Sequence, residues 1–224
     1  MKKRIPVGRA HDTLAWCLLW ALLVLMAAPA MADQRPRLLV MGDSLSAAYG
    51  IERDAGWVSL LAERLEGKAE VINASISGET SGGGAARLPE LLRQHAPEIV
   101  LLELGGNDGL RGLPPGQLRA NLAGMIEESQ AAGAQVLLLG IDIPPNYGPA
   151  YRDAFTGVYD DLAERYEVAL VPFLLKGVAL DESLMQDDGI HPTAAAQPAL
   201  LDNVWPALAP LLEQQGVALA ARGN

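Results

Sequence analysis

The chain has 224 residues, a length typical of one domain, and half of them are hydrophobic, enough for a complete core. The formal net charge is −10, which argues against a nucleic-acid partner because a polyanion would be repelled. This apolar content also argues against extended disorder.

The first 32 residues have the three parts of a secretory signal peptide. Apolar residues 14–28 precede a small-x-small cleavage pattern at Ala30-Met31-Ala32. An uncleaved membrane anchor is the alternative, but the apolar run is short for a span of about 20 residues. We expect export, to the periplasm or the medium, and a mature domain of residues 33–224. The basic residues that open the segment are Lys2, Lys3, Arg4 and Arg9.

Cys17, the only cysteine, lies within this segment. The mature domain would therefore have no disulfide and no thiol chemistry, which suits an oxidising compartment.

Short apolar runs alternate with segments of helical period along the rest of the chain. This alternation predicts βαβ units, and hence an α/β fold with a doubly wound parallel sheet. The predicted strands are 37–41, 70–74, 99–104, 135–140 and 169–173. The predicted helices include the apolar positions of 57–65, 88–92, 118–126, 151–166 and 200–212. In such sheets ligands bind beyond the carboxyl ends of the strands, so the residues that follow each strand are candidates for the site.

His191 is the strongest candidate for a catalytic base. Of the three histidines, His11 lies in the predicted signal segment and His95 ends a predicted helix, where it can complement the helix dipole. His191 stands in a loop after the last strand, three residues after Asp188. A turn of that length can bring the carboxylate onto the imidazole N–H, as the acid of a Ser–His–Asp triad requires. The alternative is a loop histidine beside an Asx-turn.

Ser44 follows the first strand in the stretch Gly42-Asp43-Ser44. At a strand-to-helix junction, a serine can be a nucleophile whose own N–H points toward a developing oxyanion. The alternative is a helix N-cap, a role that Asp43 or Ser46 could also fill. The sequence contains no Gly-x-Ser-x-Gly, so the usual α/β-hydrolase elbow is absent.

Gly78 and Asn107 are candidate oxyanion donors, through a backbone N–H and a side-chain amide. Each is weak alone, because glycine and Asn-Asp pairs are common in loops. Because both residues follow predicted strands, they are expected to lie at the same edge of the sheet, which strengthens their assignment. Gly106, which has no side chain, would leave space beside Asn107.

Together, Gly42-Asp43-Ser44-Leu45-Ser46, Gly78, Gly105-Gly106-Asn107-Asp108 and Asp188-Gly189-Ile190-His191-Pro192 resemble the four blocks of the SGNH (GDSL) hydrolases. The resemblance implies a flavodoxin-like three-layer α/β/α sandwich with a five-stranded parallel sheet. It also implies a serine esterase that needs no metal or cofactor. The implied catalytic residues are Ser44, Asp188 and His191, and the implied oxyanion hole is Ser44, Gly78 and Asn107.

The stretches "NASISGETS", "ELGGNDGLRG", "IPPNYGPAYRDAF" and "MQDDGIHPTAAAQP" look like the periplasmic thioesterase I, lysophospholipase and arylesterase branch. That branch implies hydrolysis of acyl thioesters, aryl esters, short-chain esters and lysophospholipids. The resemblance also favours a mobile flap over the acyl chain at residues 143–155, whose alternative is an ordinary loop. Its predicted substrate-binding residues are Ile143, Pro144, Pro145, Asn146 and Tyr147.

Two other functions remain open at this point. A carbohydrate O-acetylesterase would share the triad but would have a shallow polar groove. A flavodoxin-like binding protein would need a phosphate loop, and no Walker or Rossmann glycine pattern is present. The expected partner is a small acyl ester or thioester, with no nucleic acid and no stable membrane span after cleavage. We expect a monomer, although no pattern in the chain fixes the oligomeric state.

Overall fold

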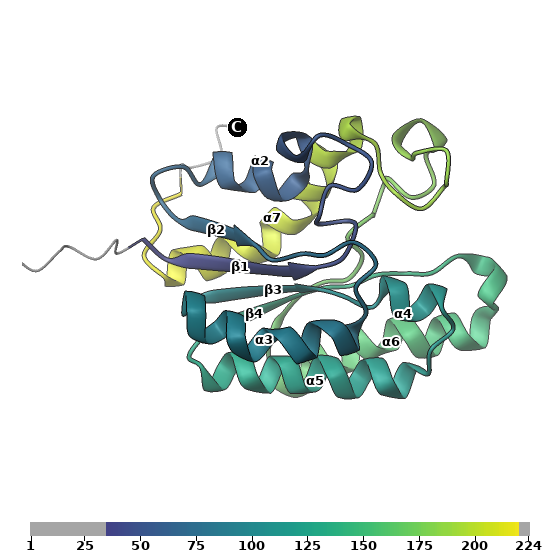
Figure 1. Cartoon of the computed structure of the whole chain (residues 1–224), viewed down its shortest axis with the longest axis horizontal. Coiled ribbons are helices and arrows are strands. Elements are labelled where there is room, and N and C mark those ends of the chain that lie inside the picture. Colours follow the sequence, from purple (N-terminus) through teal and green to yellow (C-terminus); the bar gives the residue numbers. More distant parts are fainter. Residues whose placement is uncertain (1–34, 220–224) are drawn as a thin grey trace, which may run out of the picture. The chain divides into compact units, whose positions relative to one another are not determined.

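The computed structural model describes residues 35–219, which form a parallel sheet with helices on both faces (Figure 1). The five strands lie in the order β2-β1-β3-β4-β5 and pair in parallel throughout, as predicted. Their bounds are β1 Arg37–Gly42, β2 Glu70–Asn73, β3 Ile99–Glu103, β4 Gln135–Leu139 and β5 Ala169–Val171. The predicted signal peptide, residues 1–32, lies outside the described residues.

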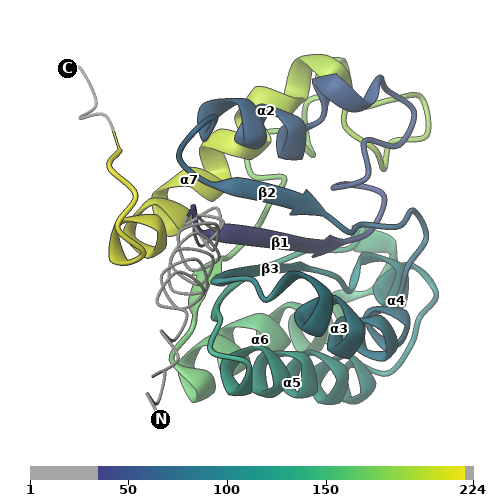
Figure 2. The same ribbon diagram turned by 60° about the vertical axis from the view of Figure 1, so that its left-hand side comes forward.

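The helices form the two outer layers of the sandwich, on either side of the sheet (Figures 1 and 2). One layer contains α2 Trp57–Arg64 and α7 Gln197–Gln214. The other contains α3 Ser81–His95, α5 Pro115–Ala131 and α6 Pro149–Tyr166. A short helix, α4 Gly106–Leu110, starts just after β3. This three-layer arrangement confirms the predicted fold class.

The central strands β1 and β3 are buried along nearly their whole length, because helices cover both faces of the sheet. In β1 the residues Leu38 to Met41 have no exposed surface, and β3 is likewise buried at every position. This is why both strands read as continuous apolar runs rather than alternating patterns. Within residues 35–219, no helix combines the length and the apolar character needed to cross a bilayer.

The segment after β1 differs from the expectation. Ser44 does not begin a helix: residues 44–50 form consecutive turns, and a 3₁₀ helix, Arg53–Ala55, comes before α2. Two positive φ angles, +57° at Ala48 and +73° at Gly50, interrupt any right-handed helix here. The turn is fixed at its start, because the Asp43 carboxylate accepts a hydrogen bond from Leu45 N (3.1 Å).

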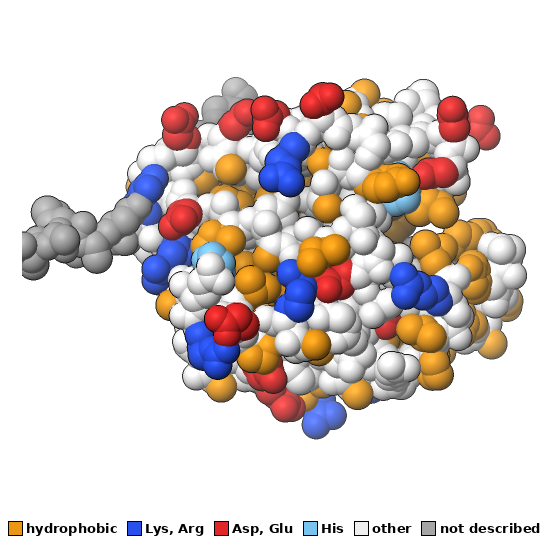
Figure 3. All heavy atoms as spheres, in the orientation of Figure 1, with side chains coloured by type: hydrophobic (Ala, Val, Ile, Leu, Met, Phe, Trp, Pro, Cys, Tyr) orange, Lys and Arg blue, Asp and Glu red, His pale blue; other side chains and the backbone are white. Residues whose placement is uncertain are grey.

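In Figure 1 the loops that follow β1 and β2 leave the sheet at the same, right-hand edge. Acidic side chains gather along the upper edge of the face drawn in Figure 3, over α2 and the loops at its right, while basic side chains are scattered below. This distribution agrees with the acidic balance of the sequence.

Candidate active site

Ser44, His191 and Asp188 form a continuous chain of hydrogen bonds beyond the carboxyl ends of the strands. His191 Nε2 lies 2.9 Å from Ser44 Oγ, although the two residues are 147 positions apart. His191 Nδ1 lies 2.6 Å from Asp188 Oδ2. A serine hydroxyl, an imidazole and a carboxylate in this order are the parts of an acyl-transfer triad.

The loop before α7 holds Asp188 and His191 in one tight turn. Asp188 Oδ1 accepts hydrogen bonds from the backbone N–H groups of Ile190 (2.9 Å) and His191 (3.0 Å). Gly189 has a φ of +66°, which glycine adopts without strain. Gln186 N donates to His191 O (2.7 Å) and closes the turn from the other side. The turn predicted between the acid and the histidine is therefore present.

These hydrogen bonds keep Asp188 ionised. The His191 side chain and then the His191 N–H lower the Asp188 pKa to about 2. A carboxylate that stays charged can hold one imidazole tautomer and stabilise the imidazolium that forms when His191 takes a proton.

The backbone N–H groups of Ser44 and Gly78 are two of the candidate oxyanion donors. Within residues 35–219, neither Ser44 N nor Gly78 N donates a hydrogen bond to a protein acceptor. Gly78 has a φ of +81° and open space where a side chain would stand. Arg111 Nη2 donates to Gly78 O (3.0 Å) and fixes this peptide unit.

The Asn107 side-chain amide, unlike these two N–H groups, already donates hydrogen bonds within the protein. Asn107 is the second residue of α4, and its Nδ2 donates to Asp43 Oδ2 (2.9 Å) and to Glu79 O (3.0 Å). Both amide hydrogens therefore have protein acceptors. An oxyanion would be an additional acceptor for one of them, or would replace one of these bonds.

The two glycines before Asn107 let the chain pass close to other atoms. Gly105 has a φ of +126°, and a Cβ there would lie 2.2 Å from Tyr159 Oη. A Cβ at Gly106 would lie 3.1 Å from Asp43 Oδ2, the oxygen that accepts from Asn107. Any side chain at Gly106 would press on the carboxylate that orients Asn107.

Glu103 is a buried acid beside the site that was not among the residues predicted from the sequence motifs. Its Oε2 accepts from Ser46 Oγ (2.7 Å) and Asp43 N (3.2 Å), and within the described residues Oε1 is buried without a hydrogen-bond partner. Burial, and then the charge of Asp43, raise the Glu103 pKa well above its usual range. Burial also raises the Asp43 pKa to about 6. The sequence signal that could have identified Glu103 is an acidic residue at the end of an otherwise apolar strand.

Asp108, beside Asn107, has a structural contact. It is buried, and its carboxylate accepts from Ser81 N (2.8 Å) and Ser81 Oγ (2.5 Å). This pair joins α4 to the first residue of α3, so it fixes the helix that carries Asn107.

The irregular part of the segment predicted as a flap, residues 143–155, is shorter than expected. A 3₁₀ helix spans Pro145–Tyr147 and α6 begins at Pro149, so most of residues 143–155 is helical. Ile143 is buried, and a Cβ at Gly109 would lie 2.4 Å from its Cγ2, so Ile143 supports the loop from below. The loop's exposed residues include Pro144, Pro145 and Asn146, whereas Tyr147 is half-buried.

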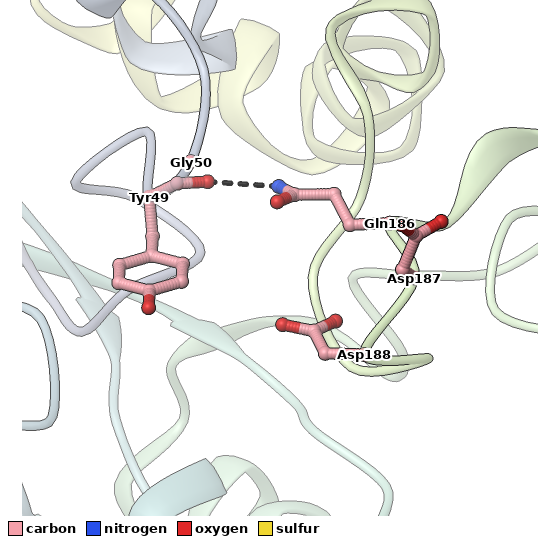
Figure 4. Close-up of a pocket in the computed structure, with 5 residues that line it drawn as sticks. All are labelled: Tyr49, Gly50, Gln186, Asp187 and Asp188. Atoms are coloured by element: carbon pink, nitrogen blue, oxygen red, sulfur yellow. Dashed lines mark hydrogen bonds between the residues drawn. The ribbon is translucent and has the colours of Figure 1, made fainter.

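A hollow of about 750 Å³ opens beside the triad (Figure 4). It is lined by Tyr49, Gly50, Gln186, Asp187 and Asp188. Apart from Asp188, these residues were not among the predicted site residues. None of the five predicted flap residues lines it.

Comparisons with known proteins identify the family of this chain. Residues 40–198 match the model of the GDSL-like lipase/acylhydrolase family. Esterase TesA of Pseudomonas aeruginosa is 56% identical over 193 residues, which cover 85% of this chain and 94% of that protein. Thioesterase 1/protease 1/lysophospholipase L1 of Escherichia coli is 46% identical over 202 residues, 90% of this chain and 96% of that protein.

A solved structure has the same fold. The crystal structure of the psychrotrophic esterase EstA from Pseudoalteromonas sp., inhibited by monoethylphosphonate, superposes with a TM-score of 0.76 at 43% sequence identity. The match covers 79% of this chain and 98% of that one.

Proposed function

Because the chain belongs to the GDSL-like lipase/acylhydrolase family and is an ester hydrolase, we propose that it works as a serine esterase through an acyl-enzyme on Ser44. Family membership confirms the resemblance to SGNH hydrolases. The observation that carries the proposed mechanism is the hydrogen-bonded chain from Ser44 Oγ through His191 to Asp188.

In the first half-reaction, Ser44 Oγ attacks the acyl carbonyl carbon while His191 Nε2 takes the hydroxyl proton. Asp188 stabilises the imidazolium through Nδ1–H. The tetrahedral intermediate collapses when the bond to the leaving oxygen or sulfur breaks, and His191 returns its proton to that atom. Water then attacks the acyl-enzyme by the same steps in reverse, and releases the acid and free Ser44.

The negative oxygen of the tetrahedral intermediate is held by N–H donors. The Ser44 and Gly78 backbone N–H groups supply two of them, and both are without protein acceptors within the described residues. Asn107 supplies the third when its amide turns part of its donation from Asp43 or Glu79 to the oxyanion. The proposed steps use only side chains and backbone groups of this chain, with water and the substrate.

The proposed substrates are acyl thioesters, aryl esters, short-chain esters and lysophospholipids. Support comes from relatives named for esterase, thioesterase, lysophospholipase and arylesterase activities. Export by the signal segment, to the periplasm or the medium, and a monomeric mature domain of residues 33–224 belong to the same proposal. The sequence pattern of residues 1–32 supports the export and the start of the mature domain; it has no bearing on the monomeric state.

A covalent probe tests the proposal. A fluorescent alkylphosphonate should label the purified protein, because a triad serine attacks phosphorus and loses the leaving group. The Ser44→Ala variant should take no label, whereas a Ser59→Ala variant on α2 should be labelled as the parent is. Full labelling of Ser44→Ala, with mass spectrometry placing the adduct on Ser46, Ser77 or Ser81, would contradict the assignment.

A further inference from the structure

The hollow beside His191 has an aromatic side and a polar side. In Figure 4 the Tyr49 ring and the Asp188 carboxylate face each other across it, with Gln186 and Asp187 along the second side. Tyr49 comes from the turn after β1 and the other side from the loop before α7. The hollow therefore lies between the two segments that carry Ser44 and His191.

The Tyr49 ring is packed against the base of the triad. Its centroid lies 4.4 Å from that of the His191 ring, with 39° between the planes. Tyr49 nevertheless remains 51% exposed, although a large aromatic residue tends to be buried. An exposed ring in contact with a catalytic imidazole offers an aromatic surface to whatever lies beside that imidazole.

The two sides are held together by direct contacts. Gln186 Nε2 donates to Tyr49 O (2.8 Å) and to Pro192 O (3.0 Å). Gly50 permits this approach, because a Cβ there would lie 2.2 Å from Gln186 Oε1. The hollow is thus a formed part of the fold rather than a gap between independent loops.

The chemistry of the triad places the leaving group next to this hollow. His191 Nε2 must lie within hydrogen-bond reach of the leaving atom to protonate it. A leaving group that extends past His191 on this side meets the Tyr49 ring, which packs on the imidazole. The acyl group, by contrast, is proposed to pass under the loop after β4.

The hollow also carries negative charge. Asp188 is bonded to His191, but the exposed Asp187 carboxylate has no hydrogen-bond partner within the described residues. An unpaired carboxylate at the side of a binding hollow repels anions and attracts cations over about a Debye length, ~10 Å at 0.1 M salt.

From these contacts we infer that the hollow between Tyr49 and residues 186–188 is the leaving-group subsite. Tyr49 favours aromatic leaving groups by stacking, and Asp187 disfavours those that carry negative charge. The inference rests on the proposed esterase function, because it takes His191 as the group that protonates the leaving atom.

The first experiment tests the aromatic side with a phenyl ester and a trifluoroethyl ester of the same acyl group. For each ester, kcat/KM of the variant is divided by kcat/KM of the parent, so that differences in the intrinsic reactivity of the two esters cancel. Tyr49→Leu should reduce hydrolysis of the phenyl ester about 2- to 10-fold more than that of the alkyl ester. Tyr49→Phe keeps the ring and is the matched control, so it should show the same relative loss for both esters.

The second experiment tests the charge with phenyl esters that carry a meta carboxylate, a meta trimethylammonium or no charged group. Asp187→Asn should raise kcat/KM for the anionic ester relative to the neutral one by about 2- to 5-fold at low salt, and lower it for the cationic ester. Both effects should shrink as salt increases. Asp160→Asn on α6, which removes an exposed charge that does not line the hollow, should leave the three esters in their original ratio.

Two results would overturn the inference. One is an equal loss on phenyl and alkyl esters in Tyr49→Leu, which would show that Tyr49 only supports His191. The other is an unchanged ratio of anionic to neutral esters in Asp187→Asn at low salt. Neither result would contradict the proposed esterase function. That function is tested separately, by the labelling and activity of the Ser44→Ala variant.

Discussion

Ser46 Oγ donates a buried hydrogen bond of 2.7 Å to Glu103 Oε2, and this contact joins the end of β3 to the turn that carries Ser44. The same carboxylate oxygen accepts from Asp43 N, and a Cβ at Gly42 would lie 2.7 Å from it. Asp43 in turn accepts from Asn107, so one hydrogen-bond network reaches from β3 to Asn107, one of the proposed oxyanion donors.

The free energy of unfolding of the Glu103→Gln variant should increase relative to that of the parent as the pH rises. The folded-state Glu103 pKa is raised, so above pH 4.5 the folded state keeps a proton that the unfolded chain has lost. The parent therefore loses free energy of unfolding with rising pH, by about 1.4 kcal/mol per pH unit while Glu103 stays protonated. The amide of the Glu103→Gln variant has no proton to lose in this range, so the variant lacks this dependence.

Urea unfolding of both proteins from roughly pH 5 to 8 measures this difference. Glu128→Gln on α5, where the side chain is exposed, is the control and should show no trend with pH relative to the parent. A constant offset between Glu103→Gln and the parent at every pH would show that Glu103 titrates as an ordinary acid.

The acid limb of kcat/KM should contain two ionisations. One is the loss of the proton from His191, which frees this residue to act as a base. The structure adds Asp43, whose pKa burial raises to about 6, and whose carboxylate orients Asn107. Asp188, with its pKa lowered to about 2, stays charged through this range.

A plot of log(kcat/KM) against pH should therefore approach a slope of about 2 at its acid end for the parent. Asp43→Asn should have lower activity and a slope of about 1. A chelator in the assay should change neither profile. A parent slope of 1 would leave His191 as the one controlling group, and activity restored only by added zinc or calcium would refute the proposed mechanism.

Asn107→Ala should lower kcat by about 10²–10³-fold with a smaller change in KM, because an oxyanion donor acts mainly in the transition state. Since the amide also bonds Asp43 and Glu79, the unfolding free energy must be measured beside the kinetics. A large loss of stability with little change in kcat would assign Asn107 a structural role. An effect on KM alone would assign it to substrate binding.

Tyr147→Ala should flatten the preference for longer acyl chains and hardly affect acetyl esters. Each methylene enclosed by the loop contributes about 0.8 kcal/mol, so a closed loop favours long chains. Tyr147 holds the loop, since its Oη donates to Leu110 O (2.6 Å) and its ring stacks on Tyr151. Pro144→Gly should act in the same direction by loosening the loop.

The measurement is kcat/KM against chain length from acetyl to palmitoyl esters. Tyr147→Phe, which keeps the ring and loses the hydrogen bond, separates the two contacts. Curves for Tyr147→Ala and the parent that run parallel at every length would show that the loop does not select the acyl chain. The carbohydrate O-acetylesterase would then be the better reading.

The strands and their end residues were predictable from the sequence. A parallel strand covered on both faces is mostly apolar, so β1 and β3 stand out as apolar runs. Parallel strands bring their carboxyl ends to one edge, and this placed Ser44, Gly78 and Asn107 together before any contact was known. The turn from Asp188 to His191 is local and followed from a spacing of three residues.

Only the tertiary structure decided which side chains meet across the chain. Glu103 reads as one acid in an apolar run, and its bond to Ser46, 57 residues away, depends on the pairing of β1 with β3. Tyr49 meets His191 from a run of turns after Ser44, with a positive φ at Ala48, where a helix was expected. Sequence patterns record burial and local turns, whereas contacts between distant segments depend on how the elements pack, which no local pattern encodes.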